Sequence, residues 1–166
     1  MKRARPAPVP SHPPEAARMR RVPKALRPHS VEIDWTALEA EARRAREAAY
    51  APYSGYRVGA ALLAEDGRVF LGANVENASY GLCQCAERSA IGAAVTLGAR
   101  RFRAICIATG GDEPATPCGM CRQVLAEFPP SFPVRCIAAG GKRIDSDTAA
   151  LLPAGFGPAV LDGGRD

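Results

Sequence analysis

The chain is 166 residues long, with 47% hydrophobic and 23% charged residues, which suits one compact domain whose core needs no disulfides. No apolar run reaches the length of a membrane span, and the N-terminus lacks the apolar stretch of a secretory signal, so we expect no membrane partner. The net charge of +5 resides in residues 1–30, which hold eight basic side chains and one acidic side chain. The remainder has fourteen basic and sixteen acidic side chains, so it offers no basic surface of the kind that nucleic-acid binding needs.

Residues 1–30 also contain seven of the fifteen prolines and almost no large apolar side chain. Such a segment cannot bury enough apolar surface to offset the entropy that it loses on ordering, so we predict a disordered and dispensable tail. The tail is Arg-rich like a transit peptide, but its prolines oppose the amphipathic helix of such peptides. A translation start at Met19 is the plainer explanation. We expect one folded domain over residues 31–166.

The first predicted element of the domain is a helix that begins after Asp34, a plausible N-cap, and ends by Pro52. Leu38, Ala42 and Ala45 recur at helical spacing and predict its buried face. Residues 57–64 and 68–75 then have the composition of two strands, and the acidic Gly-containing turn between them predicts a hairpin.

Beyond the hairpin, strands and helices are predicted to alternate. Residues 84–97 are predicted as a helix closed by Gly98, residues 103–109 as a buried strand, and residues 119–128 as a short helix. Residues 133–139 complete the regular elements as a strand, followed by a short turn of helix and an irregular end. This order predicts an α/β domain in which helices cover a mixed sheet.

Four of the six cysteines are clustered in sequence, as Cys-x-Cys at 83–85 and Cys-x-x-Cys at 118–121. Without a secretory signal, such clusters indicate metal ligation in a reducing, cytoplasmic compartment rather than disulfides. Cys106 and Cys136 lie inside apolar strand-like runs, and we expect them to be small buried hydrophobic residues.

Cys85, Cys118 and Cys121 are the candidate zinc ligands, because three thiolates at helix starts can face one tetrahedral ion and leave a fourth position for water. Glu87 is the nearest base for that water. Both histidines lie within residues 1–30, so the domain has no Ser-His-Asp or Cys-His machinery. The alternative is a structural four-cysteine site with Cys83 as the fourth ligand, although Cys-x-Cys is tighter than the usual spacing of such sites.

Three thiolates on Zn²⁺ leave a net charge of −1, which weakens the acidification of bound water. Arg88, three residues after Cys85, is the candidate that compensates this charge, and Arg122 is a second one. The ordinary alternative for Arg88 is a surface salt bridge.

Several motifs in one order resemble the zinc-dependent cytidine deaminases of the short, three-cysteine type, from about Trp35 to Phe156. They are Cys-Ala-Glu-Arg at 85–88, Pro-Cys-Gly-Met-Cys-Arg-Gln at 117–123, Ala-Pro-Tyr-Ser at 51–54, Val-Gly-Ala-Ala-Leu at 58–62, Asn-Val-Glu-Asn-Ala-Ser-Tyr-Gly-Leu at 74–82, and Leu-Leu-Pro at 151–153. The resemblance implies a three-layer α/β/α sandwich with a mixed sheet of about five strands. It also implies one zinc ion per subunit and a homotetramer.

The resemblance implies roles at matching positions. Zinc-bound hydroxide would attack C4 of cytosine, and Glu87 would move protons between that oxygen, ring N3 and the leaving ammonia. Asn74 and Glu76 would bind the ribose hydroxyls, although capping of loops is their ordinary alternative. Tyr56 stands where the family usually has Phe against the pyrimidine. The positions that would help to complete a neighbouring subunit's pocket are Ala78, Tyr80 and Phe156.

Cysteine at position 85, where deaminases of nucleotides and polynucleotides usually have His, favours free nucleosides as substrates. The predicted reaction is hydrolytic deamination of cytidine and 2′-deoxycytidine in pyrimidine salvage. Two alternatives remain open: a blasticidin-type aminonucleoside deaminase, and a non-catalytic zinc-stapled module that binds nucleic acid through its basic tail.

Overall fold

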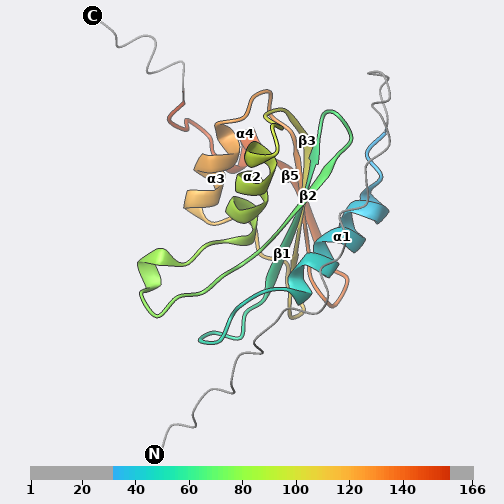
Figure 1. Ribbon diagram of the computed structural model, residues 1–166. Helices are drawn as coiled ribbons and strands as arrows, with labels where there is room; N and C mark the ends of the chain where they lie inside the picture. Colours follow the sequence, from blue (N-terminus) through green and yellow to red (C-terminus); the bar gives the residue numbers. More distant parts are fainter. Residues whose placement is uncertain (1–31, 158–166) are drawn as a thin grey trace, which may run out of the picture.

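A mixed five-stranded sheet in the order β2-β1-β3-β4-β5 separates helix α1 from helices α2 and α3 (Figure 1). The computed structural model describes residues 32–157, and the predicted tail of residues 1–30 lies outside that range. Only β3 and β4 pair in parallel, and the other neighbouring strands are antiparallel. The predicted three-layer α/β/α sandwich is therefore confirmed. The strands are β1 Val58–Ala64, β2 Val69–Ala73, β3 Phe102–Thr109, β4 Pro133–Ile137 and β5 Arg143–Asp147.

Helix α1 (Trp35–Glu47) covers one face of the sheet alone. Asp34 caps it as predicted, since its carboxylate accepts a hydrogen bond from the backbone N–H of Ala37 at 3.0 Å. The helix lies very close to β1, because a Cβ added at Gly59 would stand 2.2 Å from the carbonyl oxygen of Ala42. Only glycine permits this approach of helix and strand.

Helices α2 (Ala86–Thr96) and α3 (Gly119–Ala126) cover the other face. A stripe of fully buried alanines, at positions 86, 90 and 94, lets α2 approach β2 as closely as α1 approaches β1. A Cβ added at Gly72 would stand 2.2 Å from the carbonyl oxygen of Ala86. The helix ends as predicted at Gly98, whose φ of 84° is a conformation that glycine adopts without strain.

The predicted irregular end is wrong in one respect, because residues 143–147 form the edge strand β5, antiparallel to β4. The short helix α4 (Thr148–Leu151) follows it. Four of the five side chains of β5 are polar and Ile144 is exposed, so the strand has no apolar alternation by which a sequence pattern could identify it. Backbone pairing and the ion pair of Arg135 with Asp145 hold it in place instead.

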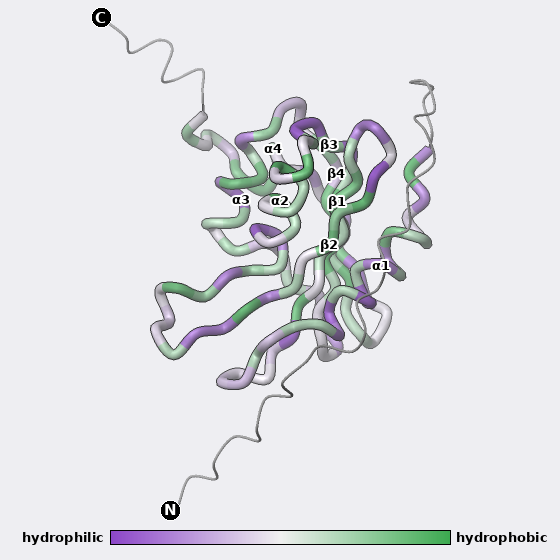
Figure 2. Tube along the Cα trace, viewed as in Figure 1, coloured by the Kyte–Doolittle hydropathy of each residue, from purple (hydrophilic) through white to green (hydrophobic). Residues whose placement is uncertain are grey.

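Hydrophobic residues are concentrated along the central strands, and hydrophilic ones gather in loops such as the turn between β1 and β2 (Figure 2). The larger core cluster, which includes Phe70, Ile105 and Phe132, lies between the sheet and α2 and α3. A smaller cluster around Leu38 and Cys106 lies under α1. Within residues 32–157, no helix combines the length and apolarity that crossing a membrane requires.

Candidate metal centre

The three predicted ligand cysteines converge at the starts of α2 and α3. Their sulfur atoms all lie within 4.8 Å of one another. The Sγ atoms of Cys85 and Cys118 are 3.8 Å apart, and those of Cys118 and Cys121 are 3.6 Å apart. Tetrahedral zinc with Zn–S bonds of about 2.3 Å requires sulfur atoms about 3.8 Å from one another. The thiols therefore stand at the spacing that one zinc ion requires.

Two of the three cysteines are N-caps rather than helical residues. Cys85 was predicted within the first turn of its helix, but it precedes the first helical residue of α2, and Cys118 does the same for α3. Neither sulfur accepts a capping hydrogen bond from the backbone N–H groups of its helix, which leaves lone pairs for a metal. The positive ends of two helices point toward the cluster, and this potential favours thiolates.

The surroundings of Cys85 favour the thiolate form of its side chain. A hydrogen bond from the Cys121 thiol lowers the pKa of Cys85 to about 5, and Arg88 adds to this effect. The same interaction raises the pKa of Cys121, because its proton is held between the two sulfurs. The cluster thus carries negative charge that attracts a cation.

Glu87 occupies the first turn of α2 and is only 5% exposed. Burial raises the pKa of its carboxyl, and the negative charge of Cys85 raises it further. Carboxyl groups with raised pKa values can hold a proton near neutral pH and release it again, which is the property of a general acid–base. Its side chain lines the same cavity as Cys85 and Cys118.

The guanidinium of Arg88 lies beside the cluster, with its NH2 nitrogen 3.9 Å from the sulfur of Cys85 and 2.7 Å from the carbonyl oxygen of Cys83. It forms no ion pair with a carboxylate among residues 32–157, so the surface salt bridge considered from the sequence is not observed there. Arg122 points elsewhere, donating to the carbonyl oxygens of Pro117 and Leu151.

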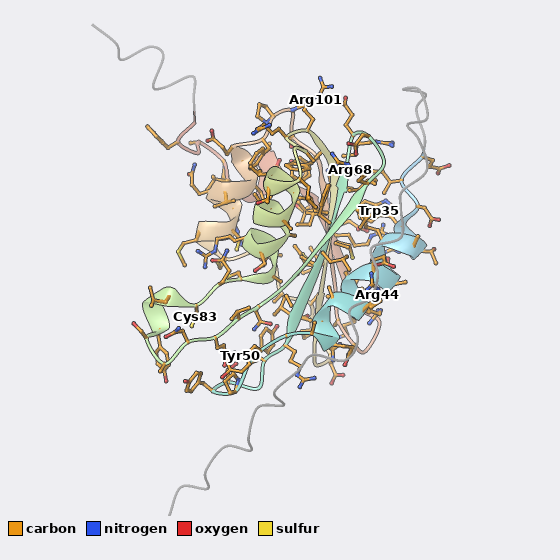
Figure 3. All side chains as sticks on the ribbon, in the orientation of Figure 1. Trp35, Arg44, Tyr50, Arg68, Cys83 and Arg101 are labelled. Atoms are coloured by element: carbon orange, nitrogen blue, oxygen red, sulfur yellow. The ribbon has the colours of Figure 1, made fainter. Side chains whose placement is uncertain are left out.

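Cys83 does not belong to the sulfur cluster. Its sulfur accepts a hydrogen bond from the backbone N–H of Asn77 at 3.4 Å. Figure 3 shows Cys83 on the segment that leads into α2. The four-cysteine site considered from the sequence is not formed, because only three sulfurs within residues 32–157 meet at one point.

A cavity of about 270 Å³ opens beside the three cysteines, near the lower limit of volumes typical of small-molecule sites. Tyr56, Asn74 and Glu76, to which the resemblance assigns contacts with the pyrimidine and the ribose, are among the residues that line it. Asn74 also bridges two backbone groups, accepting from the N–H of Val58 and donating to the carbonyl of Tyr56, each at 2.8 Å. The position of Asn74 is therefore compatible with both roles considered from the sequence, binding of a ribose hydroxyl and capping of a loop.

Glu76 likewise lines the cavity and forms hydrogen bonds that hold a loop. One carboxylate oxygen accepts hydrogen bonds from the backbone N–H groups of Tyr53 and Ser54, at 2.8 and 3.2 Å, and the other accepts from the Ser54 hydroxyl. These bonds lower the pKa of Glu76, the Ser54 hydroxyl most, and keep it ionised. The carboxylate fixes the loop that carries Tyr56 on the cavity wall.

Ala78, Tyr80 and Phe156 do not line the cavity of their own chain. Tyr80 is 76% exposed and Phe156 is 57% exposed, unusual values for large apolar side chains. The structure therefore does not bring these three residues to the site within one subunit.

The end of β3 and the loop after it form a wall of the cavity that was not predicted from the sequence. Its residues there are Ile107, Thr109, Ala115 and Thr116. The position of this loop offered a signal, because it runs directly into Cys118 and its last residues must lie beside the metal ligands.

Comparisons with known proteins agree with this geometry. A family described as the cytidine and deoxycytidylate deaminase zinc-binding region matches residues 35–134. A cytidine deaminase of Sporosarcina psychrophila is 46% identical over 125 residues, which cover 75% of this chain and 92% of that protein. One of Halalkalibacterium halodurans is 52% identical over 99 residues, covering 60% of this chain and 75% of the relative.

Solved structures show the same likeness. The crystal structure of a cytidine deaminase from Burkholderia pseudomallei superposes with a TM-score of 0.72 at 46% identity, and the match covers 75% of this chain and all (100%) of that one. A cytidine deaminase from Mycobacterium tuberculosis superposes with a TM-score of 0.66 at 40% identity, covering 76% and 99% of the two chains.

Proposed function

Since the chain belongs to the cytidine and deoxycytidylate deaminase family, we propose that it hydrolyses cytidine and 2′-deoxycytidine to uridine and 2′-deoxyuridine, with release of ammonia. The observation that carries this proposal is the placement of a buried carboxyl, Glu87, against a cavity that also exposes two of three thiols at zinc-binding distances. A purely structural metal site would have no use for a buried acid that forms no ion pair within residues 32–157.

Cys85, Cys118 and Cys121 would hold the zinc ion, whose chemistry is to act as a Lewis acid that makes a water molecule nucleophilic at neutral pH. Glu87 would take a proton from that water and donate it to N3 of the cytosine ring, and would then carry the remaining proton of the attacking oxygen to the departing amine. Its raised pKa suits a group that must be protonated and deprotonated within one turnover. Arg88 would offset the excess negative charge of three thiolates.

The cavity supports a nucleoside rather than a nucleotide as the substrate. Among its lining residues within the described part of the chain, none is Lys, Arg or His, so no positive side chain is available there for a phosphate. Tyr56 would pack against the pyrimidine, and the amide of Asn74 and the carboxylate of Glu76 would bind the ribose hydroxyls.

We extend the proposal to a homotetramer whose subunits share their active sites. Exposed Tyr80, Leu82 and Phe156 support it, because apolar side chains of this size are seldom left in water without a partner surface. Ala78 lies in the same exposed loop as Tyr80. Each subunit would use these residues to complete a neighbour's cavity, which leaves Tyr56 as the only aromatic ring that its own described residues contribute.

We propose that the reaction serves pyrimidine salvage and takes place in the cytoplasm. All six cysteines are free thiols, and thiol ligands of zinc need a reducing compartment to stay in that state.

One experiment tests the proposed reaction and its alternatives together. The purified chain is assayed for zinc content and for deamination of cytidine, 2′-deoxycytidine, cytidine 5′-monophosphate and blasticidin. We expect turnover of the two free nucleosides and little of the nucleotide. Preference for blasticidin would favour the aminonucleoside deaminase, and bound zinc without turnover of any cytosine nucleoside would refute the proposal.

A further inference from the structure

The segment after α4, residues 152–157, holds a tight turn that is unusual for an exposed loop. Ala154 has a φ of 56°, in the left-handed region that residues with a Cβ seldom adopt. A Cβ added at Gly155 would lie 2.6 Å from a methyl carbon of Leu152, so the chain folds back closely on itself there. Such a turn keeps its shape only where surrounding contacts hold it.

Those contacts come from two consecutive residues of α3. The guanidinium of Arg122 donates to the carbonyl oxygen of Leu151 at 3.2 Å, just before the turn. The amide nitrogen of Gln123 donates to the carbonyl oxygen of Phe156 at 2.7 Å, just after it. The turn is therefore fixed at both ends by one helix.

The same helix belongs to the metal centre. Cys118 caps α3 and Cys121 lies in its first turn, immediately before Arg122. Arg122 also donates to the carbonyl oxygen of Pro117 at 2.8 Å and to the hydroxyl of Thr116 at 3.0 Å, holding the residues that lead into Cys118. Zinc ligands and the turn are thus attached to a single rigid element.

The residue whose backbone this arrangement fixes is Phe156, and its side chain is largely exposed and does not line the cavity beside the cysteines. A constrained turn that leaves its aromatic side chain 57% exposed gains little from burial of that ring within the subunit. We propose that Gln123 is a positioning residue, which fixes Phe156 for contact with the nucleoside cavity of a second copy of the chain. This inference rests on the proposed function and its shared active sites.

The test compares Gln123→Met, which keeps the length and helix propensity of the side chain but removes the donor, with Gln123→Lys, which retains a donor. Glu127→Gln is the matched control, because Glu127 ends α3 with an exposed side chain. We expect Gln123→Met to raise KM for cytidine by roughly 3- to 10-fold, the size of one lost hydrogen bond. Its kcat, zinc content and assembly mass should stay as in the wild type, Gln123→Lys should restore part of the loss, and Glu127→Gln should change nothing.

A double-mutant cycle with Phe156→Ala shows whether Gln123 acts through that ring. If it does, Gln123→Met causes no further rise in KM once Phe156 is truncated. An unchanged KM in Gln123→Met, or an equal rise in the Phe156→Ala background, would overturn the inference.

Amide hydrogen exchange of residues 152–157 supplies a readout that does not depend on activity. Gln123→Met should speed exchange there, and an unchanged rate would again overturn the inference. A wild-type protein that does not deaminate cytidine would reject the proposed function instead, while the exchange result would still decide whether Gln123 fixes the turn.

Discussion

The two faces of the sheet are built from similar parts and serve different ends. On each face a helix packs closely against a strand at a glycine, which is Gly59 under α1 and Gly72 under α2. The α1 face has a buried cysteine, Cys106, and a glutamate paired with an arginine. The α2 face has a cysteine cluster, a glutamate with no basic partner in the described chain, and an arginine beside sulfur.

Position in the fold decides what each of these residues can do. Cys106 lies inside β3, where burial raises the pKa of its thiol to about 12 and keeps it inert. Cys136, inside β4, has its pKa raised to about 12 for the same reason. Cys85 stands at a helix start beside another thiol and an arginine, and its pKa is lowered to about 5.

The arginines show the same contrast. Arg135, whose side chain is only 12% exposed, pairs with Glu39 and Asp145 and stacks 4.2 Å above the centre of the Trp35 ring. It joins α1 to β4 and β5. Figure 3 shows Trp35 at the start of α1, on the opposite side of the sheet from the segment that carries Cys83. Matched substitutions on the two faces can therefore separate catalysis from packing.

The largest difference in deaminase activity is expected between the variants Cys121→Ser and Cys106→Ser. Loss of Cys121 removes a zinc ligand, and deamination should fall by more than ~10⁴-fold, because the pKa of water returns from about 7 toward about 16. Cys106→Ser should bind zinc normally and lose only stability. Metal analysis and a cytidine absorbance assay measure both variants. Equal zinc content in the two would contradict the assignment of Cys121 as a ligand.

The second contrast is between Glu87→Gln and Glu39→Gln. Glu87→Gln should retain zinc and assembly but lose ~10²–10⁴-fold in kcat, the usual contribution of a general acid–base. Glu39→Gln removes one carboxylate from Arg135 at the partly exposed α1 surface, so its kcat should match the wild type. Near-normal turnover by Glu87→Gln would remove the carboxyl from the mechanism.

Gly72→Ala and Gly59→Ala test packing on the two faces. Each added Cβ would meet a helix carbonyl oxygen at 2.2 Å, so each should destabilise the fold by about 3 kcal/mol, near the upper end of overpacking costs. Only Gly72→Ala displaces the start of α2, next to Cys85. Denaturant unfolding should give similar losses, whereas zinc competition should show weaker binding in Gly72→Ala alone. Equal zinc affinities would mean that α2 can shift without moving its ligand.

The smallest contrast is between Arg88→Ala and Arg135→Ala. Arg88→Ala should weaken zinc retention by about 10- to 100-fold, as is typical when a partner of a metal ligand is removed. Arg135→Ala should leave zinc retention unchanged and cost about 1–2 kcal/mol of stability through its lost stacking on Trp35. Competition with a chelator distinguishes them, and identical retention would leave charge compensation by Arg88 without support.

Elements with apolar periodicity could be predicted from the sequence. The cap at Asp34, the hairpin and the buried strand β3 all follow from local patterns that the tertiary structure preserves. The edge strand β5 could not, since a single apolar residue, Ile144, gives no periodic signal and the place of the strand depends on pairing with β4. Spacing alone predicts a helical Cys85, but its extended backbone places it just outside α2.

The candidate site was predictable where residues are close in sequence or carry a motif. Proximity of Arg88 to Cys85 follows from helical spacing, and the spacing also allowed Arg122 as an alternative. Only the folded structure shows that Arg122 donates to oxygens just before α3 and at the last residue of α4. Thr109 at the end of β3 and Thr116 in the following loop reach the cavity only because of how the sheet packs against α2 and α3. No local sequence pattern specifies that placement.

Zinc occupancy measured together with turnover tests the central claim most directly, that the three-thiol cluster and Glu87 form one hydrolytic centre. The wild-type protein should contain one zinc ion per subunit, and its cytidine deamination should decline in proportion as a chelator removes the metal and return when zinc is restored. Turnover that persists after the zinc is removed, or full zinc occupancy without deamination of any cytosine nucleoside, would contradict the account.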